Sequence, residues 1–234
     1  MPRWSIFIDV EGFSNIYSKS DAEALRLLGN LMLYIWKVGS QVYSNETERL
    51  FIHQYGDGFL IVSNYHESSL DRPLGIAIFL MQMMIMQGGV ARTGISEGDF
   101  GDVTGCYPKE IQDELTEHRG LRVGNGIMNI QKVMGATLIH SNRVQDKVDK
   151  KGPLLLLEGN LSGRFSNENL EIVHSSDQFI EINWIKSDPT ILNYIYEQLN
   201  IEKPTLKVLT NNLNQYIEKY SLSGDWRDNT RNLI

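Results

Sequence analysis

Residues 4–14 read WSIFIDVEGFS, and the expected fold is built outward from this stretch. Residues 4–10 are rich in β-branched and aromatic side chains, which is typical of a buried strand. Asp9 interrupts the apolar run, and a buried carboxylate is costly unless it is paired or binds a metal. The turn-like residues 11–15 follow. We therefore predict a strand that ends in a carboxylate in need of a partner.

The next segments alternate between helical and strand patterns. Residues 20–44 have helical apolar spacing, and Ser20 with Glu23 three residues later is typical of a helix start. Residues 50–55 and 59–63 flank a Gly-Asp-Gly turn and predict a β-hairpin.

Further elements are predicted along the rest of the chain. Pro73 is expected in the first turn of a helix that runs to about residue 87. The others are a strand at 90–96, a glycine-rich turn at 98–105 that leads into a strand, a helix at 124–134, strands at 136–141, 153–157 and 177–185, and helices after Pro189.

This order of elements predicts an α+β fold with a mostly antiparallel sheet flanked by helices. We expect one domain over residues 1–185 and a C-terminal helical extension over residues 186–234, which packs on the domain or on a dimer partner. A Rossmann fold is less favoured, because no Gly-x-Gly-x-x-Gly follows the first strand.

Composition excludes several classes of protein. The formal net charge of −7 argues against a nucleic-acid groove, which needs a basic stripe. Cys106 is the single cysteine, which fits a reducing cytoplasm, and the N-terminus lacks a signal-peptide pattern. The apolar run at 74–86 is shorter than the roughly 20 residues that cross a bilayer. We expect a cytoplasmic protein without nucleic-acid or membrane partners.

Asp57 is the second candidate carboxylate, in the hairpin turn between Gly56 and Gly58. Alone it is more often structural, because Asp-Gly is a favoured turn dipeptide. Together with Asp9 it suggests a two-carboxylate site of the hard-oxygen kind that suits Mg²⁺ or Mn²⁺. In the turn at 11–14, backbone N–H groups are placed to face a phosphate. The alternative is an ordinary turn between a strand and a helix.

Three motifs resemble those of the class III adenylyl and guanylyl cyclases. FIDVEGFS at 7–14 is similar to the family's first-strand motif, and YGDGFLIV at 55–62 to its Gly-Asp hairpin. RTGISEGDFGDVTG at 92–105 resembles its Arg-x-Gly-Ile segment and the glycine-rich turn that follows. The three occur in the family's order, and the resemblance covers about residues 4–160.

The resemblance implies a mechanism and a set of ligands. Asp9, Asp57 and the Val10 carbonyl would bind two divalent metal ions. The turn formed by Glu11, Gly12, Phe13 and Ser14 would bind the triphosphate. The family works as a head-to-tail homodimer with shared active sites. The ribose 3′-oxygen would attack the α-phosphorus and release pyrophosphate, assisted by the metals.

The residues that read the base depart from the family pattern. The Lys and Asp that recognise adenine fall here on His53 and Leu121, and no guanine-reading Glu–Cys pair replaces them. Tyr55 and Arg122 are polar alternatives that can bond the carbonyl oxygens of a pyrimidine. This departure resembles the Pycsar pyrimidine cyclases of antiphage defence. HQYGDG at 53–58 is similar to the uridylate cyclases among them, so UTP is the favoured substrate. Equally, Tyr55 can be a packed strand residue and Arg122 a solvated charge.

The family's Asn-x-x-x-Arg pair, which stabilises the transition state, is also altered. Counted from Gly124, the two positions fall on Met128 and Lys132. Asn129 is one residue along, and Asn125 lies one turn earlier on the predicted helix. Asn129 or Asn125 with Lys132 is therefore the expected pair.

The leading hypothesis is thus a pyrimidine nucleotide cyclase whose product activates a separate effector protein. Two alternatives stay open: a purine cyclase with unusual base contacts, and an inactive cyclase-like domain that binds a nucleotide or dimerises. The retained Asp9 and Asp57 favour an enzyme, and the altered Asn-x-x-x-Arg pair favours an inactive domain.

Overall fold

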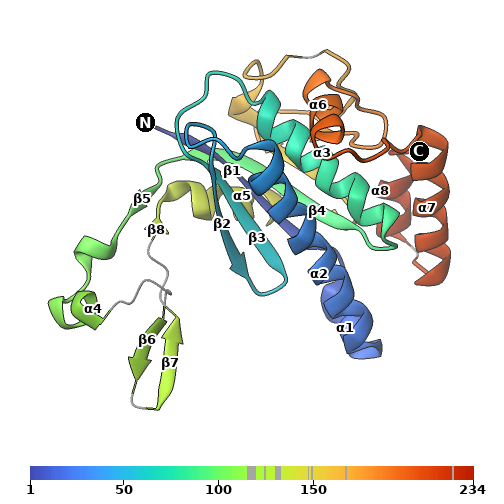
Figure 1. Ribbon diagram of the computed structural model, residues 1–234. Coiled ribbons are helices and arrows are strands. Elements are labelled where there is room, and N and C mark those ends of the chain that lie inside the picture. The colour runs from blue at the N-terminus through green and yellow to red at the C-terminus, as the bar shows by residue number, and fades with distance from the viewer. Residues whose placement is uncertain are drawn as a thin grey trace.

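The computed structural model describes residues 1–114, 120–123, 125–129, 133–146, 148, 150–166, 168–222 and 224–234. Its centre is a seven-stranded sheet made of β1 (Arg3–Val10), β2 (Leu50–Tyr55), β3 (Gly58–Ser63), β4 (Ala91–Gly98), β9 (Leu155–Glu158), β10 (Ile172–Ser175) and β11 (Phe179–Ile182) (Figure 1). The strand order is β10-β11-β9-β4-β1-β3-β2. The pair β4–β9 is parallel and the other neighbours are antiparallel. The predicted α+β class and mostly antiparallel sheet are confirmed.

Helices flank this sheet. Ser20 accepts a hydrogen bond from the Glu23 N–H at 3.3 Å, so the predicted cap starts the second helix. That helix continues into a π-helical turn, η1, in place of an α-helix to residue 44. The helices are α1 (Phe13–Lys19), α2 (Asp21–Lys37), η1 (Val38–Val42), α3 (Asp71–Met86), α4 (Lys109–Glu114), α5 (Ala136–Asp146), α6 (Thr190–Gln198), α7 (Leu206–Lys219) and α8 (Asp225–Arg231), with short 3₁₀ turns at Thr104–Cys106 and Gly159–Leu161.

Strand β1 lies among the central strands of the sheet and separates the main apolar core from the face that α5 covers. Trp4, Ile6, Ile8 and Val10 are buried in the main core, which also takes in α2 and α3. Residues between them point to the opposite face, because side chains alternate along a strand. There Ser5 Oγ donates to a carbonyl of α5 at 3.0 Å. Asp9 thus leaves the strand on the α5 face.

Helix α3 is buried on all sides, and its start and end agree with the helix predicted from Pro73 to about residue 87. It packs on β1 and β4 on one side and on α6 and α7 on the other (Figure 1). Gly75 makes room for Ile191 of α6, whose side chain occupies the place of a Cβ. The methionines at 81, 83 and 84 fill this core. The apolar run therefore serves a buried helix between the sheet and the C-terminal helices.

The segment between β4 and α5 differs from prediction. The expected helix at 124–134 is wrong: residues 120–123 form β6 and residues 126–129 form β7, an antiparallel hairpin in which Val123 pairs with Gly126. The glycine-rich segment at 98–105 contains β5 (Gly101–Asp102), which pairs with β8 (Val133–Met134) and not with β4. Figure 1 shows this arm, with α4, reaching away from the main sheet.

The strand predicted at 136–141 is also wrong, because these residues begin α5. Thr137, Ser141 and Gln145 are spaced four apart and are buried against the sheet. Thr137 Oγ1 donates to Ser5 Oγ at 2.7 Å, and Gln145 Nε2 donates to the Phe7 carbonyl at 3.1 Å. The buried face of α5 combines these polar residues with Val144, so its apolar residues do not repeat with a helical period.

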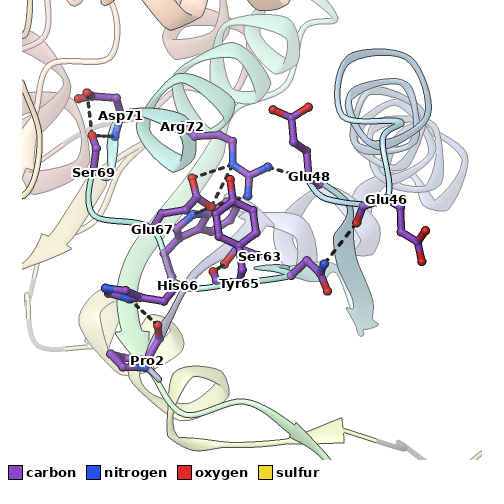
Figure 2. A network of polar contacts seen from close by, with 12 residues as sticks. Pro2, Glu46, Glu48, Ser63, Tyr65, His66, Glu67, Ser69, Asp71 and Arg72 are labelled. Carbon is purple, nitrogen blue, oxygen red and sulfur yellow. Dashed lines mark hydrogen bonds and ion pairs between the residues drawn. The ribbon is translucent and has the colours of Figure 1, made fainter.

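A buried arginine joins the start of α3 to the hairpin β2–β3. Arg72 Nε donates to both oxygens of Glu67 at 3.0 and 3.1 Å, and Arg72 Nη1 donates to the Glu48 carbonyl at 2.8 Å (Figure 2). The guanidinium carbon lies 5.0 Å from the ring centres of both Trp4 and Tyr43. This ion pair with stacked aromatic rings fixes one edge of the fold.

Candidate active site

Two carboxylates meet at one edge of the sheet. Asp9 ends β1, and Asp57 lies in the turn between β2 and β3. Because Asp9 pairs with Gly58 across the β1–β3 ladder, Asp57 is brought next to Asp9. Both line a pocket of about 180 Å³. The full lining consists of Asp9, Val10, Glu11, Gly12, Phe13, Ser14, Asn15 and Asp57.

Glycines allow this approach of the two segments. A Cβ on Gly58 would lie 2.8 Å from Phe7 Cζ and 3.3 Å from Asp9 Cβ. Gly56 has φ of 58°, in the left-handed region that glycine adopts without strain. Gly12 has φ of 74° and turns the chain from β1 into α1. The Gly-Asp-Gly and Glu-Gly-Phe segments are thus required by backbone geometry at the pocket.

The hydrogen bonding of the Asp9 carboxylate is incomplete. Its Oδ1 is buried without a hydrogen-bond partner among the described residues. Burial is the main cause that raises the pKa of the Asp9 carboxyl to about 7; the negative charges of Glu11 and Asp57 contribute to this rise, whereas Arg92 opposes it. A carboxylate in this state is stabilised by a cation, which would satisfy the orphaned oxygen.

Divalent metal ions fit the donors of this pocket. Hard cations such as Mg²⁺ are held by one or two carboxylates, with phosphate oxygens and water completing the shell. The described residues contain no group of three or more His, Cys, Asp or Glu side chains arranged to hold a metal. The pocket therefore offers two carboxylates and backbone oxygens, and leaves most positions in the shell to a ligand.

Arg92, the cationic side chain beside Asp9 on the sheet, is bound to backbone carbonyls. Arg92 of β4 pairs with Asp9 in the β1–β4 register. Its guanidinium donates to the Gln145 and Lys150 carbonyls at 2.6 Å each and to the Val148 carbonyl at 3.3 Å. Arg92 thus anchors the loop after α5, and its charge acts on Asp9 from a fixed position.

The turn after Asp9 is only partly available to a phosphate. The Glu11 N–H donates to the Val90 carbonyl at 3.0 Å, so the expectation that it faces a phosphate is wrong. Phe13 and Ser14 begin α1, and the first N–H groups of a helix have no partner within it. The donors that remain come from Gly12, Phe13 and Ser14. All three residues line the pocket.

His53 and Tyr55 share the sheet face of Asp9. Tyr55 pairs with Gly58, which pairs with Asp9, so the Tyr55 and Asp9 side chains stand in one cross-strand row. His53 stands in the next row, on the same face. Tyr55 is 38% exposed, and burial raises the pKa of its hydroxyl, which stays protonated at neutral pH. This face presents polar groups beside the carboxylate pocket.

The remaining sequence candidates lie elsewhere. Arg122, Asn125 and Asn129 belong to the hairpin of β6, β7 and their connection, which Figure 1 shows apart from the main sheet. Asn125 is in the connection and Asn129 at the far end of β7, so the expected helical pairing of the two is wrong. Leu121 is buried in β6. Lys132 lies outside the described residues.

The sequence reasoning missed two residues. Arg143 is an exposed cation on α5, the helix that packs on the face of the sheet bearing Asp9. The sequence contained a cue to Arg143, because Gly135, from which the Asn-x-x-x-Arg spacing can be counted, directly precedes this helix. Trp226 of α8 donates its Nε1–H to Glu11 Oε1 at 3.0 Å. These two residues are 215 positions apart, and no local pattern connects them.

The chain was compared with known protein families, sequences and structures. No protein-family model and no curated protein sequence matches the chain. None of the helices described here is long and apolar enough to cross a membrane. Among solved structures, a bacterial light-regulated adenylyl cyclase is 10% identical with a TM-score of 0.47, over 85% of this chain. The chain spans 57% of the length of that protein.

Two further solved structures are similar at the same level. The guanylyl cyclase Cya2 is 12% identical with a TM-score of 0.47, over 78% of this chain and 92% of its own. A class III adenylyl cyclase-like ATP-binding protein from Pseudomonas aeruginosa is 10% identical with a TM-score of 0.44, over 94% of this chain and 44% of its own.

Proposed function

We propose that this protein is a metal-dependent nucleotidyl cyclase of the class III type, with a pyrimidine nucleoside triphosphate, UTP above CTP, as its substrate. The observation that carries the proposal is the pocket shared by Asp9 and Asp57, in which Asp9 Oδ1 is buried without a partner. The two residues occupy the positions of the metal-binding aspartates in the motifs that the sequence resembles. The products are the 3′,5′-cyclic monophosphate and pyrophosphate.

The roles of the pocket residues follow from their chemistry. Asp9, Asp57 and the Val10 carbonyl are the proposed metal ligands. Two Mn²⁺ or Mg²⁺ ions held there would lower the pKa of the ribose 3′-hydroxyl and neutralise phosphate charge. The 3′-hydroxyl would lose its proton to solvent water and its oxygen would bond to the α-phosphorus, while the bond from that phosphorus to the pyrophosphate oxygen breaks. Gly12, Phe13 and Ser14 bind the departing phosphates through their N–H groups.

Base selection is assigned to the sheet face beside the carboxylates. His53 and Tyr55 lie on that face, in the rows next to and containing Asp9. The protonated Tyr55 hydroxyl donates a hydrogen bond, which suits the carbonyl oxygens of uracil. His53 occupies the place of an adenine-reading lysine, and Leu121, in the place of its acidic partner, offers no polar group.

The transition-state cation is reassigned from Lys132 to Arg143. The resembled Asn-x-x-x-Arg pattern needs a helix, whereas Met128, the position of the asparagine when counted from Gly124, lies in strand β7. Counted from Gly135, the same spacing falls on Ile139 and Arg143 of α5. An arginine fork binds phosphate oxygens in a fixed orientation, which lysine does not. Ile139 replaces the asparagine, so Arg143 carries the role alone.

The protein is proposed to act as a homodimer with shared active sites. Support comes from Arg143, which is exposed on α5, and from the β6–β7 hairpin with Arg122, Asn125 and Asn129, which stands away from the main sheet (Figure 1). In a head-to-tail dimer these residues reach the pocket of the partner. Residues 1–185 form the proposed catalytic domain, with residues 186–234 as its helical extension.

The activity is tested with purified protein, each of the four NTPs and Mn²⁺, followed by product analysis. Cyclic UMP is the expected product. Cyclic AMP or cyclic GMP as the sole product would support the cyclase activity and refute the pyrimidine specificity. Nucleotide binding by calorimetry without any turnover would identify an inactive nucleotide-binding domain. Absence of both would refute the proposed function.

The biological role proposed for the product is that of a second messenger in antiphage defence, acting through a separate effector. The support is the resemblance to pyrimidine cyclases at His53 and Tyr55. Cells that express the chain with its neighbouring genes should resist phage, and the same cells with Asp57→Ala should not. Equal plaque numbers in the two strains would exclude this role.

A further inference from the structure

The β1–α1 turn is held between two pockets. One is the carboxylate pocket with Asp9 and Asp57. The other has about 410 Å³ and lies between the turn and the C-terminal helices α7 and α8. Glu11 and Gly12 line both pockets, whereas Trp226 lines only the second. The position of this turn therefore depends on what its C-terminal side contacts.

The Glu11 carboxylate is bound on the C-terminal side. Trp226 Nε1 donates to Glu11 Oε1 at 3.0 Å, and the Gly152 backbone supplies a second hydrogen bond. The Glu11 N–H donates to Val90, so the backbone of this residue is fixed as well. Without the Trp226 bond, the Glu11 carboxylate would keep only the Gly152 backbone bond and would be freer to turn toward the metal pocket.

The donor is itself held in place. Trp226 is 8% exposed, and its ring stacks on Tyr216 of α7 with 5.8 Å between centres. Asn229 of α8 donates to the Lys151 carbonyl at 2.9 Å, next to Gly152. The indole N–H is thus oriented before any ligand binds, and a fixed donor loses little entropy when it bonds.

We propose that Trp226 is a positioning residue for the carboxylate pocket: its indole N–H keeps the Glu11 carboxylate on the α8 side of the turn, so that Asp9 and Asp57 alone face the metal. The C-terminal extension then contributes to the site through one hydrogen bond, in addition to covering the core. The identity of the ligand as a divalent metal rests on the proposed function, whereas the hold on the turn does not.

Hydrogen exchange of the metal-free protein tests the hold directly. Trp226→Phe retains the ring on Tyr216 and removes the N–H. We expect amides at residues 11–16 to exchange roughly threefold to tenfold faster, the effect of losing one hydrogen bond to a charged or polar group. Glu11→Ala leaves the Trp226 ring intact but removes the Gly152 bond as well, so it should give at least as large a change, and the double variant should exchange no faster than Glu11→Ala alone.

Trp36→Phe is the matched control, because Trp36 is 59% exposed on α2 and distant from the turn in sequence. Unchanged exchange at 11–16 in both Trp226→Phe and Glu11→Ala would overturn the proposal. Calorimetry with Mn²⁺ separates the two ideas. Accelerated exchange in a protein that binds no Mn²⁺ would retain the positioning role and refute the metal site. In a working enzyme, Trp226→Phe should lower kcat more than it changes KM.

Discussion

Gly58 and Asp9 face each other across the β1–β3 ladder so closely that a Cβ on Gly58 would lie 3.3 Å from the Asp9 Cβ. The same added atom would lie 2.8 Å from Phe7 Cζ. The hairpin that carries Asp57 can reach Asp9 only because this position has no side chain. Gly58 is therefore needed both for the packing of β3 on β1 and for the pocket that Asp9 and Asp57 share.

Gly58→Ala should lower both stability and metal binding. Overpacking at a tight contact costs about 1–3 kcal/mol, and the hairpin must shift away from β1 to relieve it. Urea denaturation measures the stability change, and calorimetry with Mn²⁺ measures binding. Gly101→Ala is the control, because an added Cβ there has no neighbour within 4 Å. Equal Mn²⁺ affinity in both variants would contradict this account of the pocket.

Asp9 should make the metal-free protein less stable as pH rises from about 4 to 7. The pKa of this carboxyl is raised to about 7 in the fold from its ordinary value of 3.8. Over this interval the folded state keeps a proton that the unfolded chain has lost, so the free energy of unfolding falls. The loss is on the order of 2–4 kcal/mol.

Asp9→Asn should remove this pH dependence and raise the stability of the metal-free protein at pH 8. Denaturant titrations of the two proteins at pH 5 and pH 8 provide the measurement. Added Mn²⁺ should stabilise the wild-type protein at pH 8 and leave Asp9→Asn unaffected. A pH profile shared by both proteins would show that Asp9 is not the group responsible.

Arg143→Ala should reduce turnover strongly while Mn²⁺ affinity stays near that of the wild type. Loss of a cation that stabilises transferred phosphate costs about 10³-fold or more in kcat. The comparison variant is Lys132→Ala, which removes the cation first expected from the sequence. A large loss of kcat in Lys132→Ala and none in Arg143→Ala would reverse the assignment.

Arg72→Met should destabilise the protein by about 3–5 kcal/mol, because it leaves the Glu67 carboxylate buried and uncompensated. Urea denaturation again gives the free energy of unfolding. Arg49→Met is a suitable control, since the Arg49–Glu46 pair is largely exposed and its loss should cost less than about 1 kcal/mol. Replacing both Arg72 and Glu67 by apolar residues should recover part of the loss. Equal stabilities in Arg72→Met and Arg49→Met would rule out the buried pair as an anchor.

The sequence predicts the parts of the fold whose apolar patterns are local. Strand β1, the capped helix after Ser20, the β2–β3 hairpin and the buried helix after Pro73 all follow from such patterns. The arm between β4 and α5 does not, because its short strands pair with each other away from the core. Helix α5 escapes prediction because three polar residues, Thr137, Ser141 and Gln145, lie on its inner face beside the buried Val144.

The same distinction applies to the candidate site. Asp9 is recognisable because a carboxylate in an apolar strand is costly, and Asp57 because of its glycine-flanked turn. Their meeting in one pocket depends on strand register, which the sequence does not state. The contact of Glu11 with Trp226 joins the two ends of the chain, and only the folded structure reveals it.

Helix α3 has a consequence for how the chain is made. Its apolar residues are covered on one side by α6 and α7, which emerge from the ribosome more than a hundred residues later. At common rates of synthesis this delay is on the order of ten seconds, during which a nearly all-apolar helix has no permanent cover. Production of this protein should therefore depend on chaperones that shield the nascent chain until its last helices arrive.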